Sequence, residues 1–304
     1  MQEELYDHKL GMLQQECKTR WSSTHAMGDS LMTAQESVQM YCVKEQMTDG
    51  DGNKFNMSFE DWDVIGQGTA SLSTIAAVVK QAEGDKYVTS SLVLPFINTC
   101  MKSLAGDGSI KQPWFGKGNT RSEFPVSSTH ESIKSARKSV REDLELRWVT
   151  NLSEERKRFY LIATVLDPRT KLLSFCDNKY FPSSWKDEGH AFLSMEFKCF
   201  YMDHTQGEVN DTEVQVPKPS VLDDLLGVSC TSMDVDPSSV NGETELNAYM
   251  RVQQVANDTD PLMWWKQHQQ EFPRLTRMTR QYLVIWLFLP ALRLLRDSLT
   301  VSGL

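Results

Sequence analysis

The chain has 304 residues and a mass of 34.7 kDa, enough for one large or two ordinary domains with a hydrophobic core. Apolar residues make up 40% and charged residues 24%, values that exclude a wholly disordered chain and a collagen-like one. The 41 acidic residues outnumber the 32 basic ones, giving a formal charge of −9. A chain with this charge does not coat nucleic acid through its overall field, so any contact with DNA must come from a local patch.

The first predicted helix follows Arg20 and Trp21, with an N-cap among the serines and threonine at 22–24. Five apolar residues recur at helical spacing over about five turns, namely Met27, Leu31, Ala34, Val38 and Tyr41. The pair Ser58 and Asp61 resembles a capping box that opens a second helix, which runs to about Gly84. A third helix is expected from about Ser90, with Pro95 in its early turns.

The second half of the chain is also predicted to be mainly helical. Residues 106–130 are rich in Gly, Ser, Thr and Pro and indicate a loop or linker, after which apolar residues at 133, 136, 140, 144 and 148 predict a helix. Another apolar segment ends at Asp167-Pro168, where the proline stops a helix. The expected organisation is therefore a helical segment at 1–105, a loop at 106–130, a helical segment at 131–201, an acidic flexible spacer at 202–244 and an apolar, aromatic C-terminal region at 245–304.

The cysteines, the histidines and the N-terminus exclude several function classes. The six cysteines are scattered without a CxxC pair, which favours reduced intracellular thiols over disulfides or a zinc site. The N-terminus is acidic and polar rather than signal-like, and the longest apolar run, 283–295, is too short to span a membrane. The six histidines are isolated, and no catalytic triad, carboxylate pair or phosphate loop is recognisable. We therefore expect no metal, no cofactor and no membrane contact.

Three separated segments carry a family resemblance. Residues 17–24 read CKTRWSST, residues 84–90 read GDKYVTS before Leu94-Pro95, and residues 163–169 read ATVLDPR before Lys171. In this order and spacing they resemble segments of hAT-superfamily transposases and of the zinc-finger BED-type proteins descended from them. Thr170 stands where the family usually has an aromatic residue.

A fourth segment is the most specific. Residues 245–249 read ELNAY, residues 260–265 read DPLMWW, residues 272–275 read FPRL, and Tyr282-Leu283 follows. This order resembles the C-terminal dimerisation region of the hAT family. The resemblance covers most of the chain from 17 to 285, apart from the spacer and the loop, and the sequence diverges after 285.

The resemblance implies an all-helical insertion domain, an incomplete ribonuclease-H-like remnant and a C-terminal helical dimerisation segment. An active hAT transposase uses two aspartates and one glutamate to hold divalent metal for DNA strand transfer. The aspartates would precede the TRW segment, where only about twenty residues are present, and the glutamate would follow Tyr282-Leu283, where the sequence is apolar. We therefore expect a catalytically inactive fragment without the BED finger. A reading-frame excursion at about 286–298 would explain the divergence.

The resemblance also assigns candidate site residues. We expect the apolar side chains of the C-terminal segment to form a dimer interface with a second copy or a related hAT-type protein, with Trp264 and Trp265 as anchors. This set comprises Leu246, Tyr249, Leu262, Trp264, Trp265, Phe272, Leu275, Met278, Tyr282 and Leu283. The alternative for the two tryptophans is the core of the chain itself. Arg20 and Trp21 are possible DNA contacts, because family members stack the matching tryptophan on an extruded base, and the alternative for Trp21 is packing.

Three hypotheses for function remain at this point. The first is a dimerisation module of a domesticated or decayed transposase. The second is a DNA-binding transcriptional regulator or transposase whose BED finger and aspartates lie in a missing N-terminal part, with a nuclear location implied by the resemblance. The third is a decayed transposon without a selected role.

Overall fold

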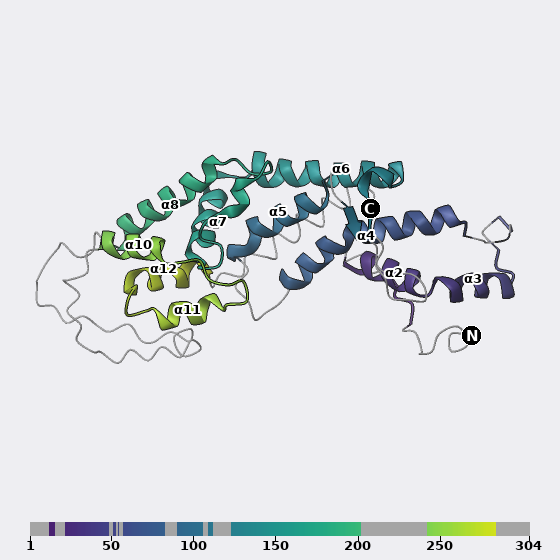
Figure 1. The fold of residues 1–304 in the computed structure, drawn as a ribbon, viewed down its shortest axis with the longest axis horizontal. Helices are drawn as coiled ribbons and strands as arrows, with labels where there is room; N and C mark the ends of the chain where they lie inside the picture. The colour runs from purple at the N-terminus through teal and green to yellow at the C-terminus, as the bar shows by residue number, and fades with distance from the viewer. Residues whose placement is uncertain are drawn as a thin grey trace, which may run out of the picture.

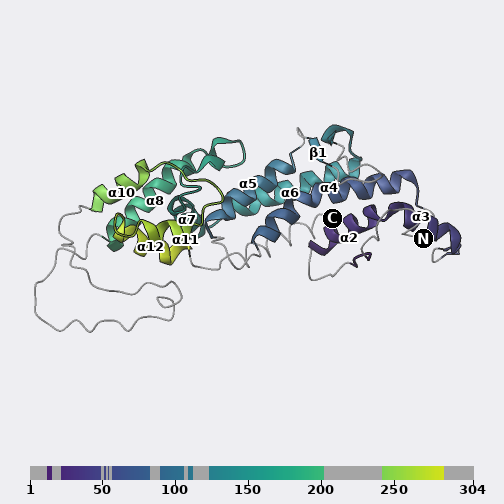
Figure 2. The same ribbon diagram turned by 60° about the horizontal axis from the view of Figure 1, so that its bottom comes forward.

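The computed structural model describes residues 12–15, 22–48, 51–52, 54, 57–82, 90–105, 109–111, 123–201 and 242–283. These residues are mainly helical, which confirms the predicted fold class at that level. Figure 1 shows an elongated molecule, with α2 and α3 at one end and α7, α8, α10, α11 and α12 at the other. The view in Figure 2, turned by 60°, shows the same long arrangement.

The first predicted helix is in fact two helices. α2 spans Ser22–Thr33 and α3 spans Gln35–Lys44, and the chain leaves helical geometry at Ala34. Ala34 is buried as predicted, but beyond it Cys42 is buried whereas Tyr41 is 49% exposed. The prediction of one continuous helix with Tyr41 on its apolar face was therefore wrong, because it extended a single helical period across the break.

The predicted second helix is α4, Phe59–Ala82, and its capping box is confirmed. The Ser58 backbone N–H donates to Asp61 Oδ2 at 2.8 Å, and the Asp61 N–H donates to Ser58 Oγ at 3.1 Å. α2 packs closely on α4 where Gly28 meets Thr69. A Cβ atom at Gly28 would lie 2.2 Å from Thr69 Oγ1, so the absence of a side chain allows this approach.

The third predicted helix begins with a 3₁₀ turn, η1 (Ser90–Leu92), and continues as α5 (Val93–Ser103). Pro95 lies in the first turn of α5, as expected. Residues 106–130 were predicted to be a loop, but the described part includes an antiparallel pair, β1 (Ser109–Lys111) and β2 (Glu123–Pro125), and a 3₁₀ turn η2 (Val126–Ser128). Strands of three residues are too short for sequence periodicity to reveal them.

The rest of the described chain is helical. α6 (Glu131–Glu145) continues into a π-helical turn, η3 (Leu146–Thr150), followed by α7 (Glu154–Leu166), a 3₁₀ turn η4 (Ser174–Asp177) and α8 (Ser184–Tyr201). The C-terminal helices are α10 (Gly242–Arg251), α11 (Pro261–Gln267) and α12 (Pro273–Leu283). α7 ends at Leu166 with Asp167 as its C-cap, directly before Pro168, as predicted. Of the predicted acidic spacer, residues 202–241 lie outside the described residues.

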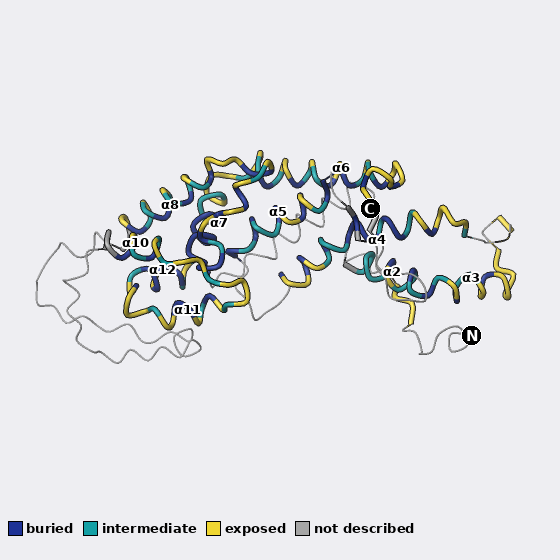
Figure 3. The backbone as a smooth tube through the Cα atoms, viewed as in Figure 1, coloured by how far each residue is buried: buried dark blue, intermediate teal, exposed yellow. Residues whose placement is uncertain are grey.

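One hydrophobic core joins these elements. It runs from the second half of α4 through α5, α6, α7 and α8 to α10, α11 and α12. Figure 3 shows that α7 is the most deeply buried helix of this end, and Leu161, Ile162, Ala163, Val165 and Leu166 are each 0% exposed. Within the described residues, no helix is both long and apolar enough to cross a membrane.

Candidate functional site

The three C-terminal helices form a compact aromatic unit. The ring of Tyr249 on α10 lies 4.9 Å from that of Trp265 on α11, and Trp264 meets Trp265 edge to face at 5.0 Å. Phe272, before α12, stacks on Trp264 at 6.2 Å, and His268 stacks on Trp264 at 4.0 Å. Such ring pairs contribute beyond the area that they bury. The short helices therefore hold one another through their rings.

Polar contacts fix the ends of these helices. Asp260 is the N-cap of α11, where its Oδ1 accepts from the Leu262 and Met263 N–H groups at 2.8 and 3.3 Å, and Pro261 occupies the first helical turn. The Leu275 N–H at the start of α12 donates to Glu245 Oε1 on α10 at 2.8 Å. Burial raises the pKa of Glu245, and the hydrogen bonds from the backbone of α12 oppose this shift.

The unit is anchored to the C-terminal end of α7. The last carbonyl groups of a helix lack partners within it, and Pro168 has no N–H to offer. The Tyr249 hydroxyl donates to the Val165 carbonyl at 2.8 Å, and Trp265 Nε1 donates to the Leu166 carbonyl at 2.9 Å. The α7 terminus, buried in the core, thus obtains its partners from the C-terminal helices. Burial, reinforced by the negative charge of Asp167, raises the pKa of Tyr249 well above its ordinary value.

Lys171 makes a further link from the same segment. Its side chain is fully buried, and its Nζ donates to the Tyr249 carbonyl at 2.9 Å and to the Val252 carbonyl at the end of α10. The ammonium group also lies 4.9 Å from the centre of the Tyr249 ring, close enough for a cation–π contact. Burial lowers the pKa of Lys171. A buried cation at the carbonyl end of α10 caps that helix through its unpaired carbonyl groups.

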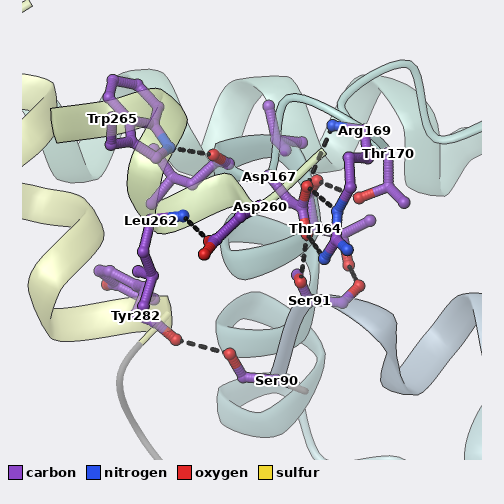
Figure 4. A network of polar contacts seen from close by, with 12 residues as sticks. Ser90, Ser91, Thr164, Asp167, Arg169, Thr170, Asp260, Leu262, Trp265 and Tyr282 are labelled. Atoms are coloured by element: carbon purple, nitrogen blue, oxygen red, sulfur yellow. Dashed lines mark hydrogen bonds and ion pairs between the residues drawn. The ribbon is translucent and has the colours of Figure 1, made fainter. Parts of the chain in front are cut away.

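Asp167 organises the other side of this junction, which Figure 4 shows from close by. Its carboxylate accepts from Ser91 Oγ at 2.6 Å, from the Arg169 N–H at 3.0 Å, and from Arg169 Nε and Nη2 at 3.0 and 2.7 Å. Asp167 is fully buried and Arg169 is 8% exposed, so the ion pair is shielded from water. Thr164 Oγ1 completes the contact by donating to the Ser91 carbonyl at 3.1 Å.

Three of the four segments that carry the family resemblance therefore meet at one place. Ser90 is the last residue of the second segment and Ser91 follows it directly, residues 164–171 come from the third segment and residues 245–283 from the fourth. Ser90 Oγ donates to the Tyr282 carbonyl at 2.9 Å, so η1 also contacts the end of α12 directly. We call this contact region, made by η1, residues 164–171 and α10 to α12, the α7 junction. Its hydrogen bonds join parts of the chain up to 192 residues apart.

The structure places most residues of the expected dimer interface inside the single chain. Eight of its ten residues are buried inside the single chain, with exposures between 0 and 9%: Leu246, Tyr249, Trp264, Trp265, Phe272, Leu275, Met278 and Leu283. Leu262 and Tyr282 are partly exposed. The segment covers its apolar area because it packs on α7, α8 and η1 as well as on itself. The alternative interpretation of Trp264 and Trp265 as core residues is the one that the structure supports.

The remaining candidate residues are the possible DNA contacts and the polar residues of the α7 junction. Arg20 and Trp21 lie outside the described residues. Sequence reasoning missed Ser91, Asp167, Arg169 and Lys171 as individual contributors, although all but Ser91 fell within the quoted segments. The available signal was an aspartate before proline with a basic residue two positions later. Within the described parts of the chain, no cluster of three or more His, Cys, Asp or Glu side chains could hold a metal ion.

Comparison with known proteins adds one match. Residues 245–287 match the model of the hAT family C-terminal dimerisation region. No curated protein matches the chain. The matched residues include most of α10 and all of α11 and α12, which form the aromatic unit at the α7 junction. The match therefore shows that the C-terminal helices are similar to an hAT dimerisation region, and it supports the derivation of this chain from an hAT-family transposase.

Proposed function

We propose that the chain is a protein-association module of a transposase-derived protein, which pairs with a second copy or with a related hAT-type protein. The observation that carries this proposal is the match of residues 245–287 to an hAT dimerisation region. The structure adds that this region shares the core of the chain through the α7 junction. A partner bound to these helices would therefore be bound to a surface that the shared core of the chain supports.

In this proposal the buried aromatic residues of the C-terminal helices do not contact the partner themselves. Trp264 and Trp265 are 7% and 2% exposed, so they shape the unit rather than face a partner. The surface of the same helices carries Met263, which is 49% exposed, together with the exposed side chains of Lys266 and Arg277. A partner would contact these outward positions.

We also propose that this chain is catalytically inactive, because the sequence after Tyr282-Leu283 is apolar where the resembled family carries its glutamate. The wider proposal, which includes the ribonuclease-H-like remnant, a BED-type relationship and a nuclear location, rests on the sequence resemblance. Its alternative is a DNA-binding regulator or transposase that depends on a BED finger and aspartates supplied by a further N-terminal part.

Co-purification tests association directly. Two copies of the full chain with different tags are co-expressed, one tag is captured, and the other is measured in the eluate. Recovery of the second copy in proportion to the first supports the proposal, whereas its absence contradicts self-association. Glu155→Gln, an exposed change on α7 outside the C-terminal helices, is the matched control and should leave recovery unchanged.

A variant with Trp264→Ala and Trp265→Ala separates folding from binding. Because both side chains belong to the core, we expect this variant to lose helical structure as well as association. Loss of association with unchanged circular dichroism and thermal midpoint would instead place the tryptophans in the interface.

A further inference from the structure

One end of the molecule exposes apolar side chains on α3 and on the first residue of α4. Met40 is 46% exposed and Val43 is 72% exposed, both on α3. Met47, just after α3, is 42% exposed, and Phe59 is 90% exposed. We call this region, together with the charged residues described between 35 and 63, the α3 end. Figures 1 and 2 place it at the opposite end of the long axis from α11 and α12.

α3 exposes apolar side chains on its outward side. Its buried residues are Ser37 and Cys42, whereas Met40 and Val43, three positions apart, share the outward side. A helix that faces water on one side normally carries polar residues there. Methionines adapt to irregular surfaces and are common where partners bind. The outward face of α3 therefore has the composition of a contact surface.

The α3 end is also acidic. Its described residues between 35 and 63 include six acids and two lysines, and Glu36 and Glu45 flank the exposed methionine and valine on α3. Both glutamates are exposed. A partner for this surface should therefore combine an apolar contact with positive charge.

The opposite end of the molecule has this complementary composition. We call α11 and α12 the α12 end; the two helices carry Lys266 and three arginines, at 274, 277 and 280, and no acid, while Asp260 caps the start of α11 and Glu271 lies between the helices. Lys266 and Arg277 are exposed, and Met263 supplies an exposed apolar side chain beside them on α11. α12 itself carries three arginines and no acidic residue.

We propose that two copies of the chain pair antiparallel, with the α3 end of each copy on the α12 end of the other. This inference rests on the proposed function, for which it names the two contacting surfaces. A closed pair related by a two-fold axis makes the same contact twice, so both apolar surfaces of both copies are covered. Pairing two α3 ends with each other would bring acidic surfaces together, and pairing two α12 ends would do the same with basic ones.

Charge reversal tests the proposal through rescue. The first variant is Glu36→Lys with Glu45→Lys, at the α3 end, and the second is Lys266→Glu with Arg277→Glu, at the α12 end. These four side chains are exposed, so the changes avoid the core and the α7 junction. We expect each variant alone to dimerise at least about tenfold more weakly than the unchanged chain, because like charges then face each other. An equimolar mixture should regain affinity, since one contact of the mixed pair is unchanged and the other has both signs reversed.

Sedimentation equilibrium at low and high salt provides the measurement. The proposal predicts that association of the unchanged chain weakens with added salt. A control with Lys102→Glu and Lys138→Glu, exposed lysines of α5 and α6, changes the net charge by the same amount as the α12-end variant and should leave the solution mass unchanged. Recovery of the dimer only in the mixture supports antiparallel pairing.

Other outcomes overturn the inference in distinguishable ways. If both variants dimerise like the unchanged chain, the association module stands but these surfaces are not its contacts. If the mixture fails to recover while each variant retains its circular dichroism spectrum, the two ends do not meet. If only the α12-end variant differs from the unchanged chain, and the difference is a loss of affinity for duplex DNA, the basic surface binds nucleic acid instead of a second copy. If the unchanged chain is a monomer, the antiparallel pair and the self-association part of the proposed function both fail, and pairing with a related hAT-type protein is what is left of that function.

Discussion

Replacing Asp167 with alanine should release the α7 junction. The carboxylate accepts one hydrogen bond from Ser91 and three from Arg169, so the change leaves a guanidinium with 8% exposure without its partner. Breaking a buried ion pair by removing one member typically destabilises a protein by about 3–5 kcal/mol. We therefore expect the free energy of unfolding to fall by about 4 kcal/mol, a large part of the roughly 5–15 kcal/mol that usually holds a protein folded.

Urea unfolding monitored by circular dichroism and by tryptophan fluorescence measures this loss. Asp167→Asn keeps the shape and one acceptor oxygen, so it should lose less than Asp167→Ala. In the double variant Asp167→Ala with Arg169→Met, no unpaired buried cation remains, and the total loss should be smaller than the sum of the two single losses. A loss below about 1 kcal/mol for Asp167→Ala, with additive single effects, would refute the reasoning that this ion pair stabilises the junction.

Three further changes test other parts of the structure. Trp265→Phe removes the hydrogen bond from Nε1 to the Leu166 carbonyl and should lower the unfolding free energy by about 1–3 kcal/mol in urea titrations, and an unchanged midpoint would show that the bond contributes little. Gly28→Ala should lower the thermal midpoint because its Cβ would lie 2.2 Å from Thr69 Oγ1. Adding Thr69→Ala should restore much of this loss. If it does not, the clash with Thr69 is not the cause of the lower midpoint. Burial raises the pKa of Glu245 above 4.5 in the folded chain, so the unfolded chain loses this proton first as pH rises. The free energy of unfolding should therefore fall as pH rises from 4.5 to the higher pKa of the folded state. Glu245→Gln should make the urea midpoint depend less on pH across this range, and an equal pH dependence in both proteins would contradict the assignment.

Local rules predicted most helices correctly. The Ser58 and Asp61 capping box, the early proline of α5 and the stop at Asp167-Pro168 each depend on residues close in sequence, and the structure contains all three features. Periodicity failed at Ala34, where a one-residue break between α2 and α3 shifts the buried face. Nothing in the apolar spacing distinguishes one five-turn helix from two shorter helices with a rotated register.

The candidate site was harder to predict because burial depends on contacts distant in sequence. The aromatic residues of 245–283 were recognised as a cluster, but their cover comes from residues about 80 to 190 positions earlier, which periodicity cannot reveal. Lys171 illustrates the same difficulty. A lysine is normally taken as a surface residue, and only the folded chain shows that its ammonium group caps α10 from inside the core.

The solution mass of the full chain tests the central claim of association most directly. Light scattering over a concentration series should give a mass that rises from 34.7 kDa towards twice that value and then stays constant, as expected for a closed pair. Circular dichroism on the same samples establishes that the chain is folded at every concentration. A folded chain whose mass remains at 34.7 kDa throughout would contradict self-association, and with it the antiparallel pair.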